Sequence, residues 1–431
     1  MNCAGWQRPE LYYLRNKVAA KKDGPFFAGC CLRQPTAVQE AKKIHLMNSK
    51  ILLSSPHMGG TELKYVHQAF EENWVAPLGP NVNGFEEDLE KYLGNSSYVT
   101  AMSSGTAALH LALVMLEVGR GDEVFCQSMT FAASANPIAY VGATPVFIDS
   151  ESDTWNMCPE ALAEALARRA YNGSLPKAVI VVHLYGMPAK MDELTAICEE
   201  YGVPLLEDAA EALGSTYKGI SCGTFGPMAI LSFNGNKIIT TSGGGALVTK
   251  DPALKKKCIF LSTQARDAAA HYEHTHIGYN YRLSNVSAGI GRGQMEVLDE
   301  RVAARRRNHR FYTTLFHDVE GIEVLTEPND DFFSNHWLSA ILIDPDKTGF
   351  SREDLRHRLL HRGIESRPLW KPMHMQPVFR GTDFFGSGVS EDLFRDGLCL
   401  PSGSNLGAAE HERIAEAVRT LVPKVQWSPS V

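Results

Sequence analysis

Three short segments place polar side chains beside apolar runs. The first is Ser103-Ser104-Gly105-Thr106, which follows the apolar run 98–102 and precedes an apolar helical pattern. Glycine lets a ligand approach the backbone, and the free N–H groups at a helix start attract anions. The segment therefore predicts either a phosphate site or an ordinary N-cap, because serine and threonine are favoured at caps as well.

The second segment is Glu207-Asp208-Ala209-Ala210-Glu211, after a strand predicted over 203–206. A carboxylate at a buried strand end needs a partner, because an unpaired buried charge is costly. Two interpretations fit Asp208. It faces a protonated ring nitrogen of a ligand, or it serves the protein itself as a helix cap or in an ion pair.

The third segment contains Lys237, which lies between two apolar strands and shortly before Gly243-Gly244-Gly245. A lone lysine after a turn is normally solvated. Here the glycines indicate a backbone crowded around a ligand. A lysine in an apolar pocket loses its proton readily and can then form a Schiff base with a carbonyl compound.

Taken together, the three segments match the chemistry of pyridoxal 5'-phosphate (PLP). Its phosphate needs an anion site, its pyridine nitrogen needs an acid, and its aldehyde needs a lysine. The lysine can also move protons as an amino group is transferred.

The elements that must position these residues alternate from about residue 60 to 207. Helices are predicted near 63–70 and 85–92. Strands are predicted at 98–102, 123–126, 145–148, 178–182 and 203–206, separated by helices at 107–116, 132–141, 159–170 and 191–201. Such alternation, with fully apolar strands, is typical of an α/β fold with a mainly parallel sheet covered on both faces.

The pattern changes after Glu207. Short strands are predicted near 215–217, 229–233 and 245–248 with no further helix, and then a long charged helix over 294–315. We therefore divide the chain into a poorly packed extension (1–48), a large cofactor-binding domain (49–315) and a small C-terminal α/β domain (316–431).

Composition excludes several classes of protein. The 431 residues include 42 Lys and Arg against 49 Asp and Glu, a net charge of −7, which argues against a nucleic-acid binder. No apolar run of membrane-spanning length and no signal sequence is evident. The nine cysteines are scattered without a Cys-x-x-Cys pair, which predicts a reducing cytoplasmic setting and no metal site.

Seven longer motifs carry a resemblance to a known family. The chain resembles the DegT-type sugar aminotransferases of the aspartate-aminotransferase (fold type I) superfamily from about residue 51 to 425. The motifs are SSGTAALHLAL (103–113), FAASANPI (131–138), GATPVFID (142–149), VHLYGMPAKMD (182–192), EDAAEALGSTYKG (207–219), SFNGNKIITTSGGG (232–245) and GYNYRLSNVSAGIG (278–291).

The resemblance implies roles for individual residues. Lys237 matches the Schiff-base lysine, and Asp208 matches the partner of the pyridine nitrogen. The other matched positions are the phosphate contacts Gly105, Thr106 and Ser232, the stacking aromatic Phe131, and Asn280, which reaches the cofactor of a neighbouring subunit and so implies a homodimer. Glu211 departs from the family, which often has Gln or His near the ring hydroxyl. A carboxylate there needs a proton or a cation.

A finer resemblance concerns the substrate. The stretches SFNGNKIITTSGGG, FCQSMTF, DTWNM, RPLWKPMH and CLPSGSNL are similar to enzymes that make UDP-4-amino-4,6-dideoxy-N-acetylglucosamine for bacillosamine-type glycans and exopolysaccharides. This implies a UDP-linked 4-keto-6-deoxy sugar as substrate, L-glutamate as amino donor, and pyridoxamine phosphate as the intermediate carrier.

The same resemblance suggests a wall for the nucleotide sugar. Arg367 and Lys371 would meet the diphosphate, Trp370 would stack, and His374 would complete the wall. The other interpretation is a solvated basic loop beside a core tryptophan. His183 fits equally a substrate contact or a core histidine.

Four rival functions remain to be weighed against this one. A relative that removes a sugar hydroxyl would carry His in place of Lys237. A dinucleotide-dependent dehydrogenase would need Gly-x-Gly-x-x-Gly after the first strand, where this chain has one glycine. A cofactor-binding regulator would need a recognition segment that is not evident. The fourth rival is an aminotransferase for another keto nucleotide sugar or a cyclitol ketone.

Overall fold

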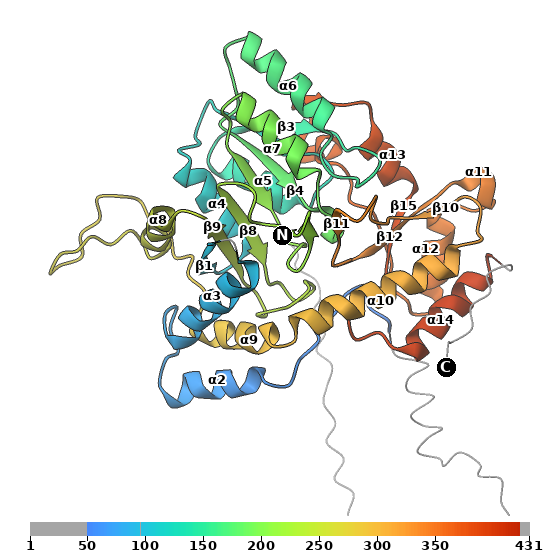
Figure 1. Ribbon diagram of the computed structural model, residues 1–431, viewed down its shortest axis with the longest axis horizontal. Coiled ribbons are helices and arrows are strands. Elements are labelled where there is room, and N and C mark those ends of the chain that lie inside the picture. The colour runs from blue at the N-terminus through green and yellow to red at the C-terminus, as the bar shows by residue number, and fades with distance from the viewer. Residues whose placement is uncertain (1–49, 95, 423–431) are drawn as a thin grey trace, which may run out of the picture. The chain divides into compact units, whose positions relative to one another are not determined.

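An eight-stranded sheet organises the larger part of the computed structural model, which describes residues 50–94 and 96–422 (Figure 1). The strands, in sheet order, are β1 (Tyr98–Met102), β9 (Gly245–Thr249), β8 (Met228–Ser232), β5 (Leu205–Asp208), β4 (Ala178–Val182), β2 (Glu123–Gln127), β3 (Thr144–Ile148) and β14 (Phe384–Phe385). All neighbours pair in parallel except β9, which is antiparallel to β1 and β8. The predicted mainly parallel α/β sheet is confirmed.

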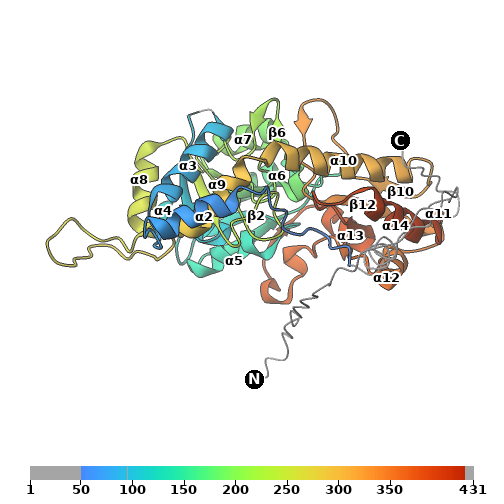
Figure 2. The ribbon, with the colours of Figure 1, turned by 90° about the horizontal axis from the view of Figure 1, so that it is seen from below.

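Helices cover both faces of this sheet (Figure 2). One face carries α4 (Gly105–Met115), α5 (Ala132–Tyr140) and α8 (Pro252–Ser262). The other carries α3 (Pro80–Leu93), α6 (Pro159–Tyr171), α7 (Met191–Glu200) and α9 (Asn285–Met295). Successive strand residues point to opposite faces. In β4, Ile180 joins one core cluster while Val179 and Val181 join another. This explains why β4 is apolar throughout.

Two helices were not predicted. The long charged helix expected over 294–315 is α10 (Leu298–Phe316), but a separate helix, α9, precedes it, and the two are separated at Val297, whose φ is −120°. Glycines bring α9 close to α2 (Glu62–Glu71), since a Cβ at Gly293 would lie 2.7 Å from the Cα of Glu62. Helix α9 thus packs on α2, whereas α10 contributes Phe311, Tyr312 and Leu315 to the core beside the small sheet.

Helix α8 was not predicted, although the sequence contains a start signal for it. Asp251 precedes Pro252, and its carboxylate accepts a hydrogen bond from the N–H of Ala253 at 2.7 Å. Aspartate at the N-cap and proline at the first helical position are a common helix start. The helices therefore do not stop after Glu207.

A smaller antiparallel sheet lies in the C-terminal part of the chain. Its order is β10 (Ile322–Val324), β12 (Ser339–Ile343), β15 (Gly397–Leu400) and β13 (Arg367–Pro368), and α10, α12 (Arg352–His361) and α14 (Ala408–Arg419) contribute to its core. The remaining elements are a three-stranded sheet of β11 (Phe332–Phe333), β6 (Thr216–Tyr217) and β7 (Ile220–Ser221), helices α11 (Pro345–Thr348) and α13 (Val389–Asp396), and 3-10 turns at 184–186, 373–375 and 377–379. The boundary at residue 315 stays a proposal, and the extension 1–48 lies outside the described residues.

Two links join the small sheet to the large one. Strand β14 returns to pair with β3, and the carboxylate of Asp149 after β3 accepts hydrogen bonds from the N–H groups of residues 387–390. The segment 51–54 pairs with the small-sheet side through Ile51 and Glu365 (N–H to O, 2.8 Å). The first link places β14 beside β3, and in the second Oγ of Ser54 donates to the Asn236 carbonyl, in the loop after β8, at 2.7 Å.

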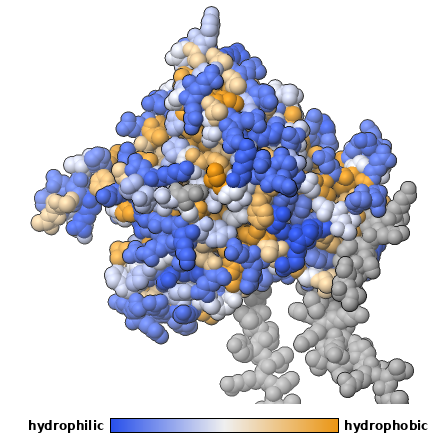
Figure 3. Space-filling view, viewed as in Figure 1, coloured by the Kyte–Doolittle hydropathy of each residue, from blue (hydrophilic) through white to orange (hydrophobic). Residues whose placement is uncertain are grey.

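The face drawn in Figure 3 is mostly hydrophilic, with apolar side chains in separate small spots. Among the described residues no helix combines the length and the apolar character needed to cross a bilayer.

Candidate active site

A cavity of about 680 Å³ lies where the chain leaves β1, β5 and β8. Segments next to the small sheet close its other side. Its walls include seven of the residues predicted for the cofactor, namely Gly105, Thr106, Phe131, Asp208, Glu211, Ser232 and Lys237. In parallel sheets the carboxyl ends of the strands are the usual place for a ligand.

The start of α4 contains the N-cap that the sequence predicted as one of two alternatives, and it also lines the cavity. Ser104 is the N-cap, and its Oγ accepts a hydrogen bond from the N–H of Ala107 at 3.0 Å. Gly105 and Thr106 follow it on the cavity wall, opposite Ser232. A Cβ at Gly105 would lie 3.2 Å from the Leu231 carbonyl oxygen, so glycine lets the helix start approach β8 closely.

Protein packing contributes to the need for the triple glycine. A Cβ at Gly245 would lie 2.2 Å from the backbone nitrogen of Gly105, and one at Gly244 would lie 2.2 Å from Oγ1 of Thr241. Only Gly243 has open space around it. Protein packing therefore requires glycine at 244 and 245, whereas Gly243 and Gly244 line the cavity, so the predicted crowding of backbone around a ligand stays a prediction.

Asp208 ends β5 and is buried, with 6% of its surface exposed. Its Oδ2 accepts a hydrogen bond from Oγ of Ser134 at 2.6 Å, and its Oδ1 accepts one from the N–H of Ala210 at 3.1 Å. No helix begins here, and no lysine, arginine or histidine of the described residues forms an ion pair with it. The helix cap and the structural ion pair are thereby excluded, and the carboxylate can accept a cationic ligand atom.

Lys237 lies in the loop after β8 with a largely buried side chain. Its Nζ is 2.9 Å from Oε1 of Glu211 and 4.1 Å from the centre of the Trp337 ring. The indole Nε1 of Trp337 donates to the Asn236 carbonyl at 2.6 Å, which fixes the ring beside the lysine loop. Lys237 is therefore not a solvated surface lysine.

Glu211 supplies the counter-charge of Lys237. Burial raises the pKa of Glu211 to about 7, although the nearby Lys237 ammonium lowers it. Its second oxygen, Oε2, accepts a hydrogen bond from the N–H of Tyr185 at 2.9 Å. In the structure the carboxylate that departs from the family pattern is thus balanced by a cation.

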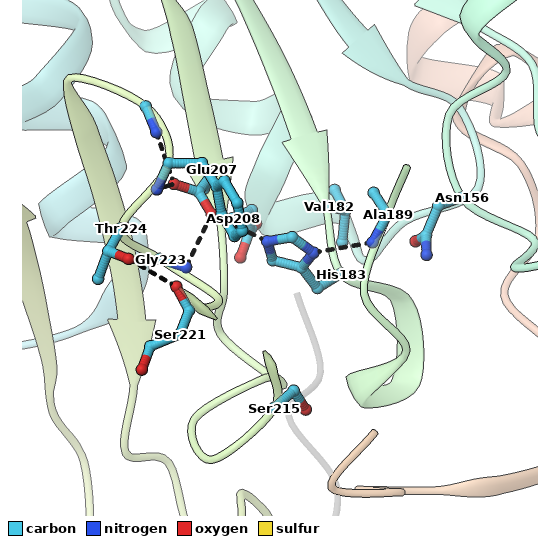
Figure 4. A network of polar contacts seen from close by, with 12 residues as sticks. Asn156, Val182, His183, Ala189, Glu207, Asp208, Ser215, Ser221, Gly223 and Thr224 are labelled. Atoms are coloured by element: carbon cyan, nitrogen blue, oxygen red, sulfur yellow. Dashed lines mark hydrogen bonds and ion pairs between the residues drawn. The ribbon is translucent and has the colours of Figure 1, made fainter. Parts of the chain in front are cut away.

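His183 does not line the cavity, which is a correction to the substrate contact considered for it. Its ring is fully buried, and Nδ1 accepts a hydrogen bond from the N–H of Ala189 (Figure 4). The ring hydrogen therefore lies on Nε2, 3.1 Å from Oε2 of Glu207. Glu207 also accepts hydrogen bonds from the N–H groups of Gly223, Phe225 and Gly226. His183 is a core histidine.

The proposed substrate wall is only partly at the cavity. Arg367 and Trp370 line it, whereas Lys371 and His374 do not. Pro372 begins a turn that directs His374 to Oγ of Ser128 (2.6 Å) and to Glu391 (3.1 Å). Substrate contacts by Lys371 and His374 therefore have no support in this structure.

Two aromatic rings define the mouth of the cavity. Phe131 is 58% exposed, and its ring centre lies 5.7 Å from that of Trp370. A large apolar side chain left this open offers its surface to a ligand. Asn280 lies away from the cavity lining with an exposed side chain.

Sequence reasoning missed several residues that shape the site. Leu53, Ser54, Trp337 and Glu365 all line the cavity but belong to distant segments. The guanidinium of Arg305 is buried among them and donates to carbonyl groups of Trp337 and Ser402, to Oγ of Ser54 and to the Lys237 carbonyl. Nothing local in the sequence marks these residues, because only the tertiary fold brings them together.

The residues present fit PLP. A buried carboxylate without a cation, a buried lysine and the free N–H groups of a helix start face one cavity. These match the ring nitrogen, the aldehyde and the phosphate.

Known proteins share this sequence and fold. A 52% identical protein of Bacillus subtilis (strain 168) is named "Putative pyridoxal phosphate-dependent aminotransferase EpsN", and the match covers 89% of this chain and all of that protein. A GDP-perosamine synthase of Escherichia coli O157:H7 is 34% identical over 84% of this chain and 96% of its own length. The solved structure of DesI with its TDP-sugar product has a TM-score of 0.79 at 28% identity, covering 88% of this chain and 94% of DesI.

These findings confirm the predicted aminotransferase fold, the aminotransferase activity on nucleotide sugars and the PLP dependence. The profile of one family matches residues 56–419. The chain belongs to the DegT/DnrJ/EryC1/StrS aminotransferase family.

Proposed function

We propose that this enzyme transfers an amino group from L-glutamate to C4 of a UDP-linked 2-acetamido-2,6-dideoxy-4-ketohexose. The product would be UDP-4-amino-4,6-dideoxy-N-acetylglucosamine, for polysaccharide or glycan synthesis. The observation that carries the transamination is the position of Lys237 Nζ in a cavity that also exposes the Asp208 carboxylate. The named exopolysaccharide relative at 52% identity and the subgroup motifs support the substrate.

Residues of the large sheet would hold the cofactor. PLP supplies an aldehyde that condenses with amines and a ring that withdraws electrons. The N–H groups at the start of α4, with Thr106 and Ser232, would bind its phosphate. Asp208 would accept the hydrogen of the ring nitrogen and hold it protonated, and Phe131 would cover one face of the ring.

Lys237 would be the proton carrier in both halves of the reaction. With its Nζ released, it takes the proton from Cα of glutamate in the first half. In the second half Nζ delivers a proton to C4 of the sugar. The face from which Lys237 acts would set the configuration at C4, and the subgroup resemblance favours the equatorial product.

Arg367 and Trp370 would hold the nucleotide sugar. Arg367 pairs with Glu365 at 2.8 Å, and its guanidinium is largely exposed, so it can turn to a diphosphate. The indole of Trp370 lies beside Phe131 and Tyr185 and offers a flat surface to the sugar.

A homodimer would complete the site. The loop that follows α8 projects beyond this helix in both views (Figures 1 and 2) and contains Tyr272, 78% exposed, and Ile277, 85% exposed. Asn280 lies at the base of this segment with an exposed side chain. We propose that Asn280 reaches the cofactor phosphate of a second copy.

The six cysteines that the structure describes are free thiols, in keeping with a cytoplasmic site of action.

A second candidate is a ketosugar carried by another nucleotide, because the chain is 34% identical to a GDP-perosamine synthase. The test is to incubate the purified enzyme with glutamate and a panel of UDP-, GDP- and dTDP-linked 4-keto-6-deoxy sugars. We expect the highest kcat/KM for the UDP-linked N-acetylated ketosugar, with the amine identified by mass and NMR. A preference for the GDP-linked sugar would favour the second candidate.

A further inference from the structure

Glu211 is held from two sides on the cavity wall. Its Oε1 accepts a hydrogen bond from Lys237 Nζ at 2.9 Å, and its Oε2 accepts one from the N–H of Tyr185 at 2.9 Å. Glu211 is 3% exposed and the Lys237 side chain is 11% exposed. An ion pair this well removed from water depends on both partners, because either charge alone would be costly to bury.

The hydrogen bond from the N–H of Tyr185 to Glu211 depends on an unusual backbone conformation. Tyr185 has a φ of +56°, in the left-handed region that residues other than glycine rarely adopt. Its phenol oxygen accepts a hydrogen bond from the N–H of Trp370 at 3.0 Å, and its ring is buried. Strain of this kind persists only where the surroundings enforce it. Oε2 of Glu211 is therefore held by a fixed backbone N–H, which does not depend on Lys237.

Two charged and two neutral titratable groups face Glu211. Lys237 contributes the cation, from the loop after β8, and Asp208 contributes a second carboxylate, from the end of β5. The thiol of Cys399 on β15 and the phenol of Tyr185 are also close. Burial raises the pKa of Cys399 to about 12 and raises that of Tyr185 as well, so both stay neutral. Without the Lys237 ammonium, Glu211 would face another carboxylate and two neutral groups.

Lys237 cannot remain an ammonium while it reacts with a carbonyl compound, because only the neutral amine is a nucleophile. An unpaired carboxylate in this position would be strongly destabilised. A proton on its carboxyl group would balance Glu211.

We propose that Glu211 stores the proton that Lys237 gives up. The N–H bond of the ammonium breaks and an O–H bond forms on Oε1 of Glu211. The neutral amine then adds to the carbonyl carbon, and water leaves. The protonated carboxyl becomes a donor toward an electron-rich oxygen of the bound ligand. The proton returns to Nζ only when the ligand leaves the cavity, because Nζ must stay neutral to take the proton from Cα of glutamate. This inference rests on the proposed function in that Lys237 reacts with a carbonyl group.

The test follows the protonated carboxyl by its infrared carbonyl band as pH is raised. In the unloaded protein, Lys237→Met removes the counter-charge, whereas Lys237→Arg keeps it. We expect the band in Lys237→Met to persist at least about one pH unit higher than in the wild type or in Lys237→Arg. The band should vanish in Lys237→Met/Glu211→Gln and remain in Lys237→Met/Glu365→Gln, since Glu365 lines the same cavity but pairs with Arg367.

The same band can be followed in the wild type, which avoids any folding defect of the variants. At a pH at which the unloaded wild type lacks the band, adding PLP should make it appear, and Glu211→Gln should abolish that gain. A carboxyl that stays ionised in Lys237→Met and after PLP is added would overturn the proposal. If the bands behave as expected but no keto nucleotide sugar is aminated, the proposed function fails while the proton exchange stands.

Discussion

Two neighbouring carboxylates at the end of β5 have opposite surroundings. Glu207 is fully buried and accepts hydrogen bonds from three backbone N–H groups and from His183. Asp208, the next residue, points to the other face of the sheet and accepts two, from Ser134 and Ala210. Glu207 has no capacity left for a ligand, whereas Asp208 has. At this strand end, Glu207 stabilises the fold, and the adjacent Asp208 is open to the cofactor.

The transamination reaction depends first on Lys237. We expect Lys237→Ala to lower the transamination rate at least about 10³-fold, because both proton transfers lose their carrier. The purified variant should also lack the visible absorbance of lysine-bound PLP. The rate is measured by glutamate-dependent formation of 2-oxoglutarate, with Lys190→Ala as the control, since Lys190 pairs with Asp153 outside the cavity. Normal turnover of Lys237→Ala would refute the assignment.

Asp208→Asn is the direct test of the open carboxylate. An amide cannot hold a positive charge on the ring nitrogen, and hydrogen bonds to charged groups contribute about 1.5–3 kcal/mol. We therefore expect kcat to fall roughly ten- to hundredfold with the cofactor still bound through its phosphate. Stopped-flow half-reactions with glutamate measure the rate, and absorbance after gel filtration measures the bound cofactor.

Glu207→Gln should show the opposite behaviour. The amide nitrogen would point at backbone N–H groups that need an acceptor, and His183 would lose its charged partner. Breaking such a buried network costs about 3–5 kcal/mol. We expect a lower urea midpoint, with a rate per folded molecule within about tenfold of wild type.

A matched comparison with Asp208→Asn makes this result decisive. Both variants replace a carboxylate by its amide at the same strand end. If Glu207→Gln lost rate and kept its stability, the division between the two residues would be wrong.

The sequence predicted the parts of this site that have local signals. Gly105 and Thr106 follow a strand and begin a helix, and Asp208 ends a strand, so their place at one sheet edge follows from alternation alone. Glu207 and His183 carry no local signal of their pairing, because β4 and β5 become neighbours only in the folded sheet.

The small-sheet side of the cavity was harder to predict. Arg367 and Trp370 are in the cavity wall, but the turn at Pro372 takes His374 away to Ser128. His374 belongs to the same sequence motif as Trp370, so both were predicted to contact the nucleotide sugar. One turn of the chain separates His374 from Trp370. A loop has no residue periodicity from which the direction of such a turn could be predicted.

The smallest expected effect concerns the support of Asp208. Oγ of Ser134 donates to Oδ2 of Asp208 at 2.6 Å and is itself 2.7 Å from Oγ1 of Thr130, so a short chain of hydroxyls orients the carboxylate. Removing one such bond costs about 1 kcal/mol. Ser134→Ala should therefore lower kcat by roughly three- to tenfold while KM for glutamate stays constant, because the carboxylate is misdirected but not removed. Ser134→Thr, which retains the hydroxyl, should restore most of the rate. An effect of Ser134→Ala as large as that of Asp208→Asn would mean that Asp208 owes its role to this one hydroxyl rather than to its open position at the cavity.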